Sequence, residues 1–187
     1  GLYYFGEQPR DTRHIFEYSP SINTPPEPSD TINDYGVEAN SYAIFAQGDY
    51  AITNRLTATL GLRYTSESKK LYAAQLNALT NPDTLLNQGS GKGKWDDASP
   101  LLSLRYQWTP EIMTYATASR GFRSGGINNL FQPTLPQNGI TPFGPETLMS
   151  YEIGARTSWF DDRLVANLST FWSEYKDIQA TFNVTVG

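Results

Sequence analysis

Alternating polarity constrains the fold of this chain more than any other feature of its sequence. In the segment that starts at Leu56, apolar residues alternate with polar or small ones, giving the sets Leu56, Ala58, Leu60, Leu62, Tyr64 and Thr57, Thr59, Gly61, Arg63, Thr65. A period of two sends these sets to opposite faces of a β-sheet. Arg63 lies mid-strand, where a packed soluble core would have to supply a partner but a water-filled lumen would not. The segment is therefore predicted to have one apolar and one wet face.

The same plan, a strand, a tight polar turn and a second strand, occurs three times. The turns are predicted at 53–55, 109–111 and 160–163, where Asn, Asp and Pro supply the usual chemistry of short hairpin links. The paired strands are expected at 41–52 and 56–66, 98–108 and 112–123, and 148–159 and 164–181. Alternation is also clear from Leu102 and from Tyr151. Both faces are mixed in the strands from Ile112 and Leu164, so their lipid-facing sides stay open.

The connections between these hairpins are long. They cover 6–40, 69–95 and 124–147, and the Gly-Ser-Gly-Lys-Gly run at 89–93 is expected to be flexible. Such loops are unusual in a compact domain, whereas short periplasmic turns opposite long extracellular loops are typical of a transmembrane β-barrel. With Leu2–Phe5 as the end of a further strand, the sequence predicts about seven consecutive antiparallel strands. Seven strands leave two open edges in lipid, so the rest of the barrel is expected outside this sequence.

Composition agrees with such a barrel. Only 39% of the residues are hydrophobic but 13% are aromatic, as expected when alternate residues face lipid and aromatic girdles mark the interfaces. The mean hydropathy of −0.47 and the absence of long apolar runs exclude helical spans, which need about 18 apolar residues. The net charge of −5 argues against nucleic-acid binding. The absence of cysteine excludes disulfides and thiolate metal sites.

Several segments resemble the TonB-dependent outer-membrane receptors. Four lie in the second and third hairpins: WDDASP at 95–100, YATASRGFRSGGIN at 115–128, PETLMSYEIG at 145–154 and YKDIQ at 175–179. AIFAQGDY at 43–50 with GLRY at 61–64 fits the same pattern one hairpin earlier. The resemblance covers about residues 42–179 in the order and spacing of the family.

This resemblance implies an all-β barrel of 22 strands that is plugged by an N-terminal domain. Residues 1–187 would be part of the barrel domain, in its later half, with the signal peptide, TonB box, plug and last strands absent. The implied function is TonB-coupled uptake of a scarce nutrient across the outer membrane, with a ferric siderophore expected ahead of haem, cobalamin or glycans. The implied partners are this cargo, the TonB complex and outer-membrane lipid, the complete barrel being monomeric. No enzymatic activity and no cofactor are expected.

Two arginines are candidates for ligand binding. Arg120 and Arg123 lie where a strand leaves the membrane for a long extracellular loop, and could attract an anionic ferric chelate. The structural alternative is that they pair with lumen carboxylates or lipopolysaccharide phosphates, or fix the strand end. The RGFR stretch recurs in receptors of the family with different cargo, which favours a structural or plug-facing role.

The remaining candidates are aromatic or acidic. Tyr72 and Phe131, in the expected extracellular loops, could stack on an aromatic siderophore, although an ordinary loop position explains either one. Trp108 and Trp159 precede periplasmic turns and are interpreted as membrane-interface anchors. His14, the only histidine, lacks converging metal ligands. The pairs Asp96–Asp97 and Asp161–Asp162 occupy turn or strand-end positions that favour Asp locally.

Two alternative functions remain open at this point. One is a passive porin or structural barrel without a plug. The other is a soluble β-sandwich that serves as a carbohydrate-binding module or an enzyme domain. The second would require buried partners for the mid-strand arginines Arg63, Arg105 and Arg156.

Overall fold

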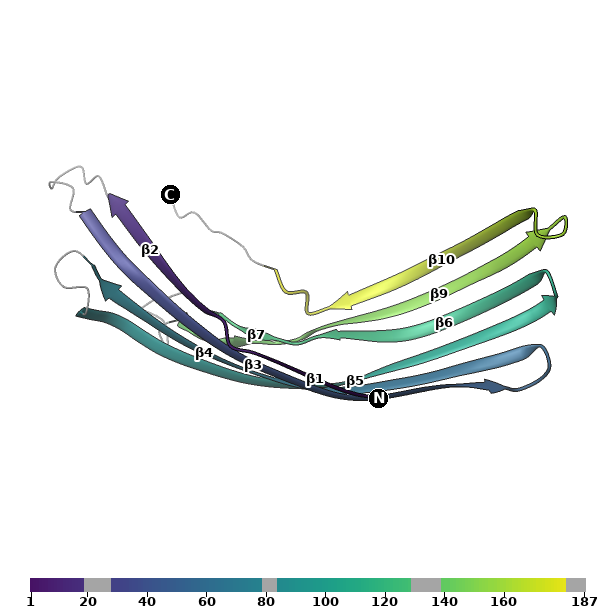
Figure 1. Ribbon diagram of the computed structural model, residues 1–187, viewed down its shortest axis with the longest axis horizontal. Coiled ribbons are helices and arrows are strands. Elements are labelled where there is room, and N and C mark those ends of the chain that lie inside the picture. The colour runs from purple at the N-terminus through teal and green to yellow at the C-terminus, as the bar shows by residue number, and fades with distance from the viewer. Residues whose placement is uncertain (19–27, 79–83, 129–138, 181–187) are drawn as a thin grey trace.

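The computed structural model describes residues 1–18, 28–78, 84–128 and 139–180 of the chain. The strands are β1 (Leu2–Glu7), β2 (Arg10–Tyr18), β3 (Pro28–Ala51), β4 (Leu56–Asn77), β5 (Thr84–Thr109), β6 (Ile112–Arg123), β7 (Gly126–Ile127), β8 (Pro142–Phe143), β9 (Glu146–Trp159) and β10 (Leu164–Lys176). The main sheet is antiparallel in the order β1-β3-β4-β5-β6-β9-β10, with β2 also paired to β3 (Figure 1). Because β1 and β2 pair with successive parts of β3, the sheet has seven strand positions. This confirms the predicted strand count and antiparallel arrangement.

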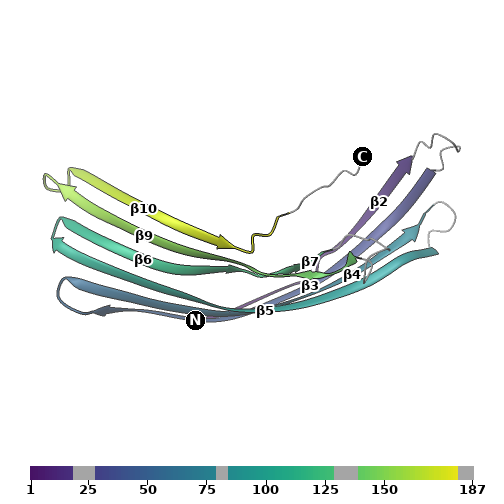
Figure 2. The ribbon, with the colours of Figure 1, turned by 180° about the vertical axis from the view of Figure 1, so that it is seen from behind.

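The three short turns lie together at one end of the sheet, called the turn end here (Figure 2). In the first, Thr53 Oγ1 accepts hydrogen bonds from the backbone N–H groups of Arg55 at 3.2 Å and Leu56 at 3.0 Å. In the third, Phe160, Asp161 and Asp162 have φ of 57°, 55° and 63°. Asp tolerates this left-handed region better than most residues do, which explains its use at this turn. The opposite end is called the loop end.

The strand register separates an outer, apolar face from an inner, polar face. Leu60 and Ile153 belong to the outer face and are 61% and 60% exposed. Ala118 of β6 is the register partner of both Leu102 and Tyr151, so it too lies on this face. The same argument places Leu164, Leu168 and Trp172 of β10 outside. The register thus supplies the lipid-facing sides that the mixed sequences of β6 and β10 left open.

Aromatic residues on the outer face form two rows. Tyr4, Tyr42, Tyr64, Tyr151 and Trp172 mark the row toward the loop end, and Tyr50, Trp108 and Trp159 the row at the turn end. The rings of Tyr4 and Tyr42 are in contact, with centroids 5.0 Å apart. The rows are separated by about 8–10 residues along a strand, or roughly 20–25 Å after strand tilt. This is the height of the apolar band of a transmembrane barrel.

Strands β3, β4 and β5 continue far beyond the aromatic row that lies toward the loop end. We call the region formed by 65–77 of β4, 84–97 of β5, the facing part of β3, and β2 the extension. The sequence predicted long loops at 6–40 and 69–95, but most of these residues are strand. The predicted flexibility of 89–93 is also wrong, because Gly91 and Gly93 pair with Leu71 and Lys69 of β4. Alternation was absent there because neither face of the extension meets lipid.

The glycines in this part of β5 leave space for neighbouring side chains and do not make the strand flexible. A Cβ on Gly91 would lie 2.7 Å from the Ile127 side chain, and one on Gly93 would lie 2.2 Å from the Trp95 ring. Both positions are on the inner face, where the described parts of the chain between β6 and β9, 124–128 and 139–145, fold over the sheet. We call these two parts the inward segment. Ile140 of this segment is fully buried against Leu71 and Ala73.

The β5–β6 ladder ends at the pair Leu101–Ser119. Pro100 is next along β5 and has no N–H group to donate to a further strand, which accounts for the end of the ladder there. Toward the loop end, β6 ends at Arg123 and leads into the inward segment, in which β7 and β8 form a small ladder. The described sheet does not close on itself, since β1 and β10 lie at opposite ends of the strand order.

No helix in the described parts of the chain is long and apolar enough to cross a membrane.

Candidate functional site

The inner face near the turn end contains a polar hollow of about 310 Å³. Tyr115 of β6 donates a hydrogen bond to Glu152 of β9, and the Arg156 guanidinium lies 5.8 Å from the centre of the Tyr115 ring. Gly154 is the register partner of Tyr115, and a Cβ at this position would lie 2.6 Å from the ring. Glycine therefore allows Tyr115 to lie across β9 and orient Glu152.

The mid-strand arginines, which were predicted to face a water-filled lumen, all lie on this inner face. Arg63 lies 5.2 Å from the ring centre of Tyr3 and 5.7 Å from that of Phe45, and its Nε donates to Thr65 Oγ1 at 3.1 Å. Arg105 and Arg156 line the polar hollow. Among the described residues, none of these three arginines makes an ion pair. The inner face thus presents three guanidinium groups, with the carboxylates of Glu152 and Asp49 on the same face, toward whatever fills the space beside it.

A second polar group, the loop-anchoring cluster, comprises Glu67, Lys69, Ser124, Glu146 and Gln179. Lys69 Nζ donates to Ser124 Oγ at 2.8 Å and to the Gly125 carbonyl at 3.0 Å, and forms an ion pair with Glu67 at 2.9 Å. Ser124 Oγ in turn donates to Glu67. Partial burial opposes ionisation of Glu67, but hydrogen bonds from Ser124, Lys69 and Ser41 outweigh it and lower the pKa of the carboxyl group. The start of the inward segment is therefore fixed to β4.

Gln179 fixes the other end of the inward segment. Its backbone N–H donates to Glu146 Oε2 at 3.0 Å, and its side-chain Nε2 donates to the carbonyls of Ser124 at 2.9 Å and Gly144 at 3.1 Å. Asp177 has a φ of 55°, which ends β10 and allows the chain to turn toward these partners. Four of the segments that carry the family resemblance thus contribute to one region of the structure, where strands pass from the apolar band into the extension.

The two candidate arginines have carboxylate partners at this level of the sheet. Arg120 Nη1 donates to Asp97, whose side chain is 6% exposed, and to the Ala98 carbonyl at 2.8 Å. Arg123 Nη1 lies 3.5 Å from Glu146 Oε1. Both contacts fit the structural alternative, in which these arginines fix the strand end. A role in ligand binding stays a prediction for both.

The other predicted residues are not brought together with the arginines. Tyr72 is exposed on the outer face of the extension, on the side opposite Leu71 and Ala73, and Phe131 lies outside the described residues. Trp108 and Trp159 lie on the outer face at the turn end, where their Nε1 groups donate to Thr114 and Thr157, each at 3.0 Å. Their interpretation as interface anchors stays a prediction. His14 lies on β2, with Nδ1 3.9 Å from Asp30 Oδ1.

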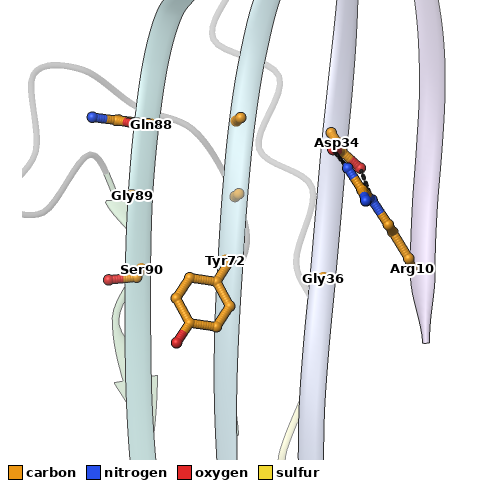
Figure 3. A pocket seen from close by; sticks show the side chains of 9 residues that line it. Arg10, Asp34, Gly36, Tyr72, Gln88, Gly89 and Ser90 are labelled. Atoms are coloured by element: carbon orange, nitrogen blue, oxygen red, sulfur yellow. Dashed lines mark hydrogen bonds and ion pairs between the residues drawn. The ribbon is translucent and has the colours of Figure 1, made fainter. Parts of the chain in front are cut away.

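Tyr72 borders a depression of about 650 Å³ on the outer face, shown in Figure 3. Arg10 reaches from β2 to Asp34 of β3, with Nε 3.0 Å from Oδ1, and Thr12 Oγ1 also donates to Asp34. The hydrogen bond from Arg10 lowers the pKa of Asp34. The floor is formed by small residues of β3, β4 and β5, namely Gly36, Ala73, Ala74 and Gly89. Sequence reasoning missed this group because β2 was expected to be loop.

Lys69 and Gln179 were also missed as structural residues. Gln179 was part of a family-like segment, but its partners lie 33 to 55 positions away along the chain. Lys69 was placed at the start of a loop, so nothing predicted its contact with Ser124. Within the described residues, no group of three or more His, Cys, Asp or Glu side chains could hold a metal ion.

Comparison with protein families identifies this architecture. The family model described as TonB dependent receptor-like, beta-barrel, matches residues 1–187. The chain belongs to the TonB-dependent receptor family. Members of this family are outer-membrane receptors and transporters rather than enzymes, which excludes the soluble β-sandwich alternative. The sheet is accordingly an incomplete barrel wall, with its inner face toward the lumen and its outer face toward lipid.

Individual relatives agree with this membership. The metal-pseudopaline receptor of Pseudomonas aeruginosa is 27% identical in one strain and 25% in another, over 75% of this chain. The ferric yersiniabactin uptake receptor of Yersinia pestis aligns over 95% of the chain with a TM-score of 0.69 and 20% identity. The alcaligin outer-membrane receptor of Bordetella pertussis aligns over 97% with a TM-score of 0.51 and 14% identity. The chain spans 18% of the curated relatives and 26% and 32% of the two structures.

Proposed function

We propose that this chain is part of a TonB-dependent receptor that carries an anionic metal chelate, with a ferric siderophore as the leading candidate, across the outer membrane. The observation that carries the proposal is the inner face of the sheet. Arg63, Arg105 and Arg156 lie there without ion-pair partners among the described residues. Guanidinium groups that are free of ion pairs can attract an anionic ligand to this face.

The relatives support this class of cargo. The Pseudomonas relative is named as a metal-pseudopaline receptor, and the two solved structures are named for ferric yersiniabactin and alcaligin. A carboxylate- or phenolate-bearing metal chelate would fit these arginines, because guanidinium groups bind such oxygens by charge-assisted hydrogen bonds. Arg120 and Arg123 are proposed to act mainly through the strand end that they fix, rather than through direct contact with cargo.

Closing the barrel requires further strands, since an open sheet edge does not survive in lipid. We propose that the complete protein has the 22 strands, the plug and the TonB contact expected from the resemblance, with residues 1–187 in the barrel wall. The inner-face arginines do not by themselves favour an energised receptor over a passive porin, and this choice rests on family membership. The distinguishing property is therefore dependence of uptake on TonB.

Uptake by the complete protein tests this proposal. Cells carrying the intact gene, a deletion, or Arg105→Gln with Arg156→Gln would be compared for accumulation of radiolabelled iron supplied as defined siderophores. Each measurement would be repeated with TonB inactivated. We expect TonB-dependent uptake of at least one chelate, and slower uptake when both arginines are replaced. A matched pair, Arg55→Gln with Arg163→Gln, removes two charges from exposed turns and should leave uptake unchanged.

Two results would contradict the proposal. Uptake that persists without TonB would indicate a passive porin. Uptake that is lost equally in the control pair would show that the inner-face arginines have no particular role. Surface labelling of the folded barrel in intact cells would confirm that each variant reaches the outer membrane.

A further inference from the structure

Three lysine side chains, the lysine patch, lie on the outer face of the extension. Lys70 of β4 and Lys92 of β5 are direct register partners, and Lys94 is the next residue on the same face of β5. Directly opposed residues in an antiparallel pair have Cβ atoms about 5 Å apart, and like charges there destabilise the pair. The register therefore holds cationic groups where an external anion would reduce their repulsion.

Carboxylates on the same face satisfy the patch only in part. Glu38 Oε2 lies 3.2 Å from Lys70 Nζ, and Asp96 Oδ2 lies 3.6 Å from Lys94 Nζ. These ion pairs are half-exposed, and such pairs contribute little and leave other ammonium hydrogens free. Lys92 is exposed and has no carboxylate partner within the described residues. The patch retains an unpaired positive charge with spare donors around it.

Along β4 and β5 the depression of Figure 3 lies next to the lysine patch and farther from the aromatic row, because Tyr72 follows Lys70 and pairs with Ser90. Tyr72 is flanked in register by Gly36 on one side and Ser90 on the other, and its ring points toward Ser90 in the figure. A Cβ on Gly36 would meet nothing within 4 Å, so the surface beside the ring is open. Arg10 is neutralised by Asp34. A neutral hollow with an exposed ring and planar hydrogen-bonding groups suits a sugar, whose apolar face stacks while its hydroxyls bond.

The chemistry of the outer face therefore changes in a fixed order along the strands. The apolar band ends near Tyr64, Lys70 follows on the same face, and Tyr72 comes next. At about 3.3 Å per residue and a tilt near 45°, these two residues lie roughly 14 and 19 Å beyond the aromatic row. Long lysine side chains can reach back several ångströms toward the membrane surface. A phosphorylated glycolipid that carries an oligosaccharide has the same order from the membrane core outward: acyl chains, a phosphorylated head group, then further sugars.

We infer that the lysine patch and the depression bind one phosphorylated glycolipid of the outer leaflet, with phosphate on Lys70, Lys92 and Lys94 and a sugar ring on Tyr72. Charge complementarity and continuity with the lipid-facing band support this ligand. The inference requires the outer-membrane location proposed above but is independent of cargo and uptake. The site lies on the opposite face of the sheet from the inner-face arginines.

Binding of defined glycolipids to the complete protein in detergent tests the inference. The probes are lipopolysaccharide with its phosphorylated oligosaccharide, the same material after enzymatic dephosphorylation, lipid A without oligosaccharide, and inorganic phosphate. Replacement of all three lysines by Gln is expected to weaken binding of phosphorylated lipopolysaccharide at least tenfold, with a smaller effect on the dephosphorylated form. Added salt should weaken the wild type more than the triple variant, since screening acts on the exposed charges.

A second variant separates the sugar contact from the phosphate contact. Tyr72→Ala should weaken binding of lipopolysaccharide about threefold to tenfold while leaving lipid A binding unchanged, and Tyr72→Phe should retain most of the affinity. Arg55→Gln with Arg163→Gln serves as the charge control at the turn end. Folding is checked for every variant by the shift in electrophoretic mobility between heated and unheated protein.

The possible outcomes are distinct. Equal lipopolysaccharide binding by the folded triple variant and the wild type would overturn the assignment of phosphate to the lysine patch. Full competition by millimolar inorganic phosphate would also overturn it, because it would indicate a free-phosphate site rather than a glycolipid site. Loss of lipid A binding in Tyr72→Ala would contradict the contact between Tyr72 and the oligosaccharide. None of these results depends on whether the protein transports iron.

Discussion

The same strands behave differently on the two sides of the aromatic row at Tyr64. Toward the turn end, β4 and β5 alternate between exposed leucines outside and polar residues inside. In the extension the same two strands stay paired, but lysine and glutamine occur on both faces, serine lies on the outer face and glycine on the inner face. The hydrogen-bonded ladder is continuous across the row, with a single register shift near Gln75. The two regions therefore share backbone structure and differ in what surrounds them.

This difference shows what alternation in a sequence reports. A period of two in polarity arises where one face meets lipid and the other meets water. In the extension polar residues occur on both faces, with Tyr72 exposed outside and Leu71 and Ala73 covered by the inward segment inside. The pattern therefore fades although the strand continues. Alternating polarity therefore indicates that the two faces of a strand meet lipid and water. Its absence does not show that the strand has ended.

The largest expected effect comes from placing a charge on the outer face in each region. Leu60→Arg in the middle of the apolar band should destabilise the complete barrel by about 2–4 kcal/mol, because the guanidinium would lie in lipid. Ser68→Arg, on the same face of the same strand in the extension, should cost at most about 1 kcal/mol. Unfolding by urea in lipid vesicles measures both values. Equal costs would refute the assignment of lipid and water to the two regions.

The part of the fold that could be read from the sequence follows the same boundary. The hairpin at 53–55, the faces around Leu60 and the strand number depended on local alternation and turn residues, so they were predictable. The extension and the inward segment depend on non-local contacts, such as Ile140 on Leu71 and Lys69 with Ser124. Gly91 appeared to be a flexible residue because its reason, the proximity of Ile127, lies 36 positions away in the chain.

The same limit applies to the candidate site. The sequence singled out Arg120 and Arg123 from their position at a strand end, and the structural alternative named lumen carboxylates as partners. The sequence alone could not identify Asp97 and Glu146 as the partners of these arginines, because the pairing depends on the register between neighbouring strands. The contact between Arg10 and Asp34 could not be predicted, because the residues of β2 were expected to form a loop.

A matched glycine pair compares the inward segment with the outer face of the extension. A Cβ on Gly125 would lie 2.1 Å from the Phe143 carbonyl oxygen and 2.4 Å from Trp95, whereas one on Gly36 would meet open space. Gly125→Ala should therefore displace the inward segment and cost about 1–3 kcal/mol, as overpacking usually does. Gly36→Ala should cause no loss. Hydrogen exchange of 124–128 and 139–144 would detect the displacement, and equal protection in both variants would contradict the close packing.

Gln179→Leu tests how the inward segment is held at its second end. The change removes the Nε2 donor to the carbonyls of Ser124 and Gly144 while keeping the backbone donor to Glu146. Lost hydrogen bonds of this kind cost about 1–2 kcal/mol in total, and most of the loss should be local. We expect faster proteolysis within 139–144 and an almost unchanged unfolding midpoint. A large shift of that midpoint would show that the cluster stabilises the barrel wall itself.

The smallest effect concerns acid sensitivity of the same segment. Hydrogen bonds from Ser124, Lys69 and Ser41 lower the pKa of Glu67 in the folded protein in spite of partial burial, so its carboxylate stabilises the fold above the unfolded pKa, near 4.5. This contribution should be lost as the pH falls from that value through the lower folded pKa. Protection of 124–128 against exchange should therefore decrease as the pH falls below about 4.5 and through the lowered pKa of the folded state. Glu67→Gln should remove this decrease, whereas Asp49→Asn, which changes a carboxylate near the turn end, should leave it intact. An acid response that survives in Glu67→Gln would assign it to another group and separate the acid behaviour of the segment from its anchor on β4.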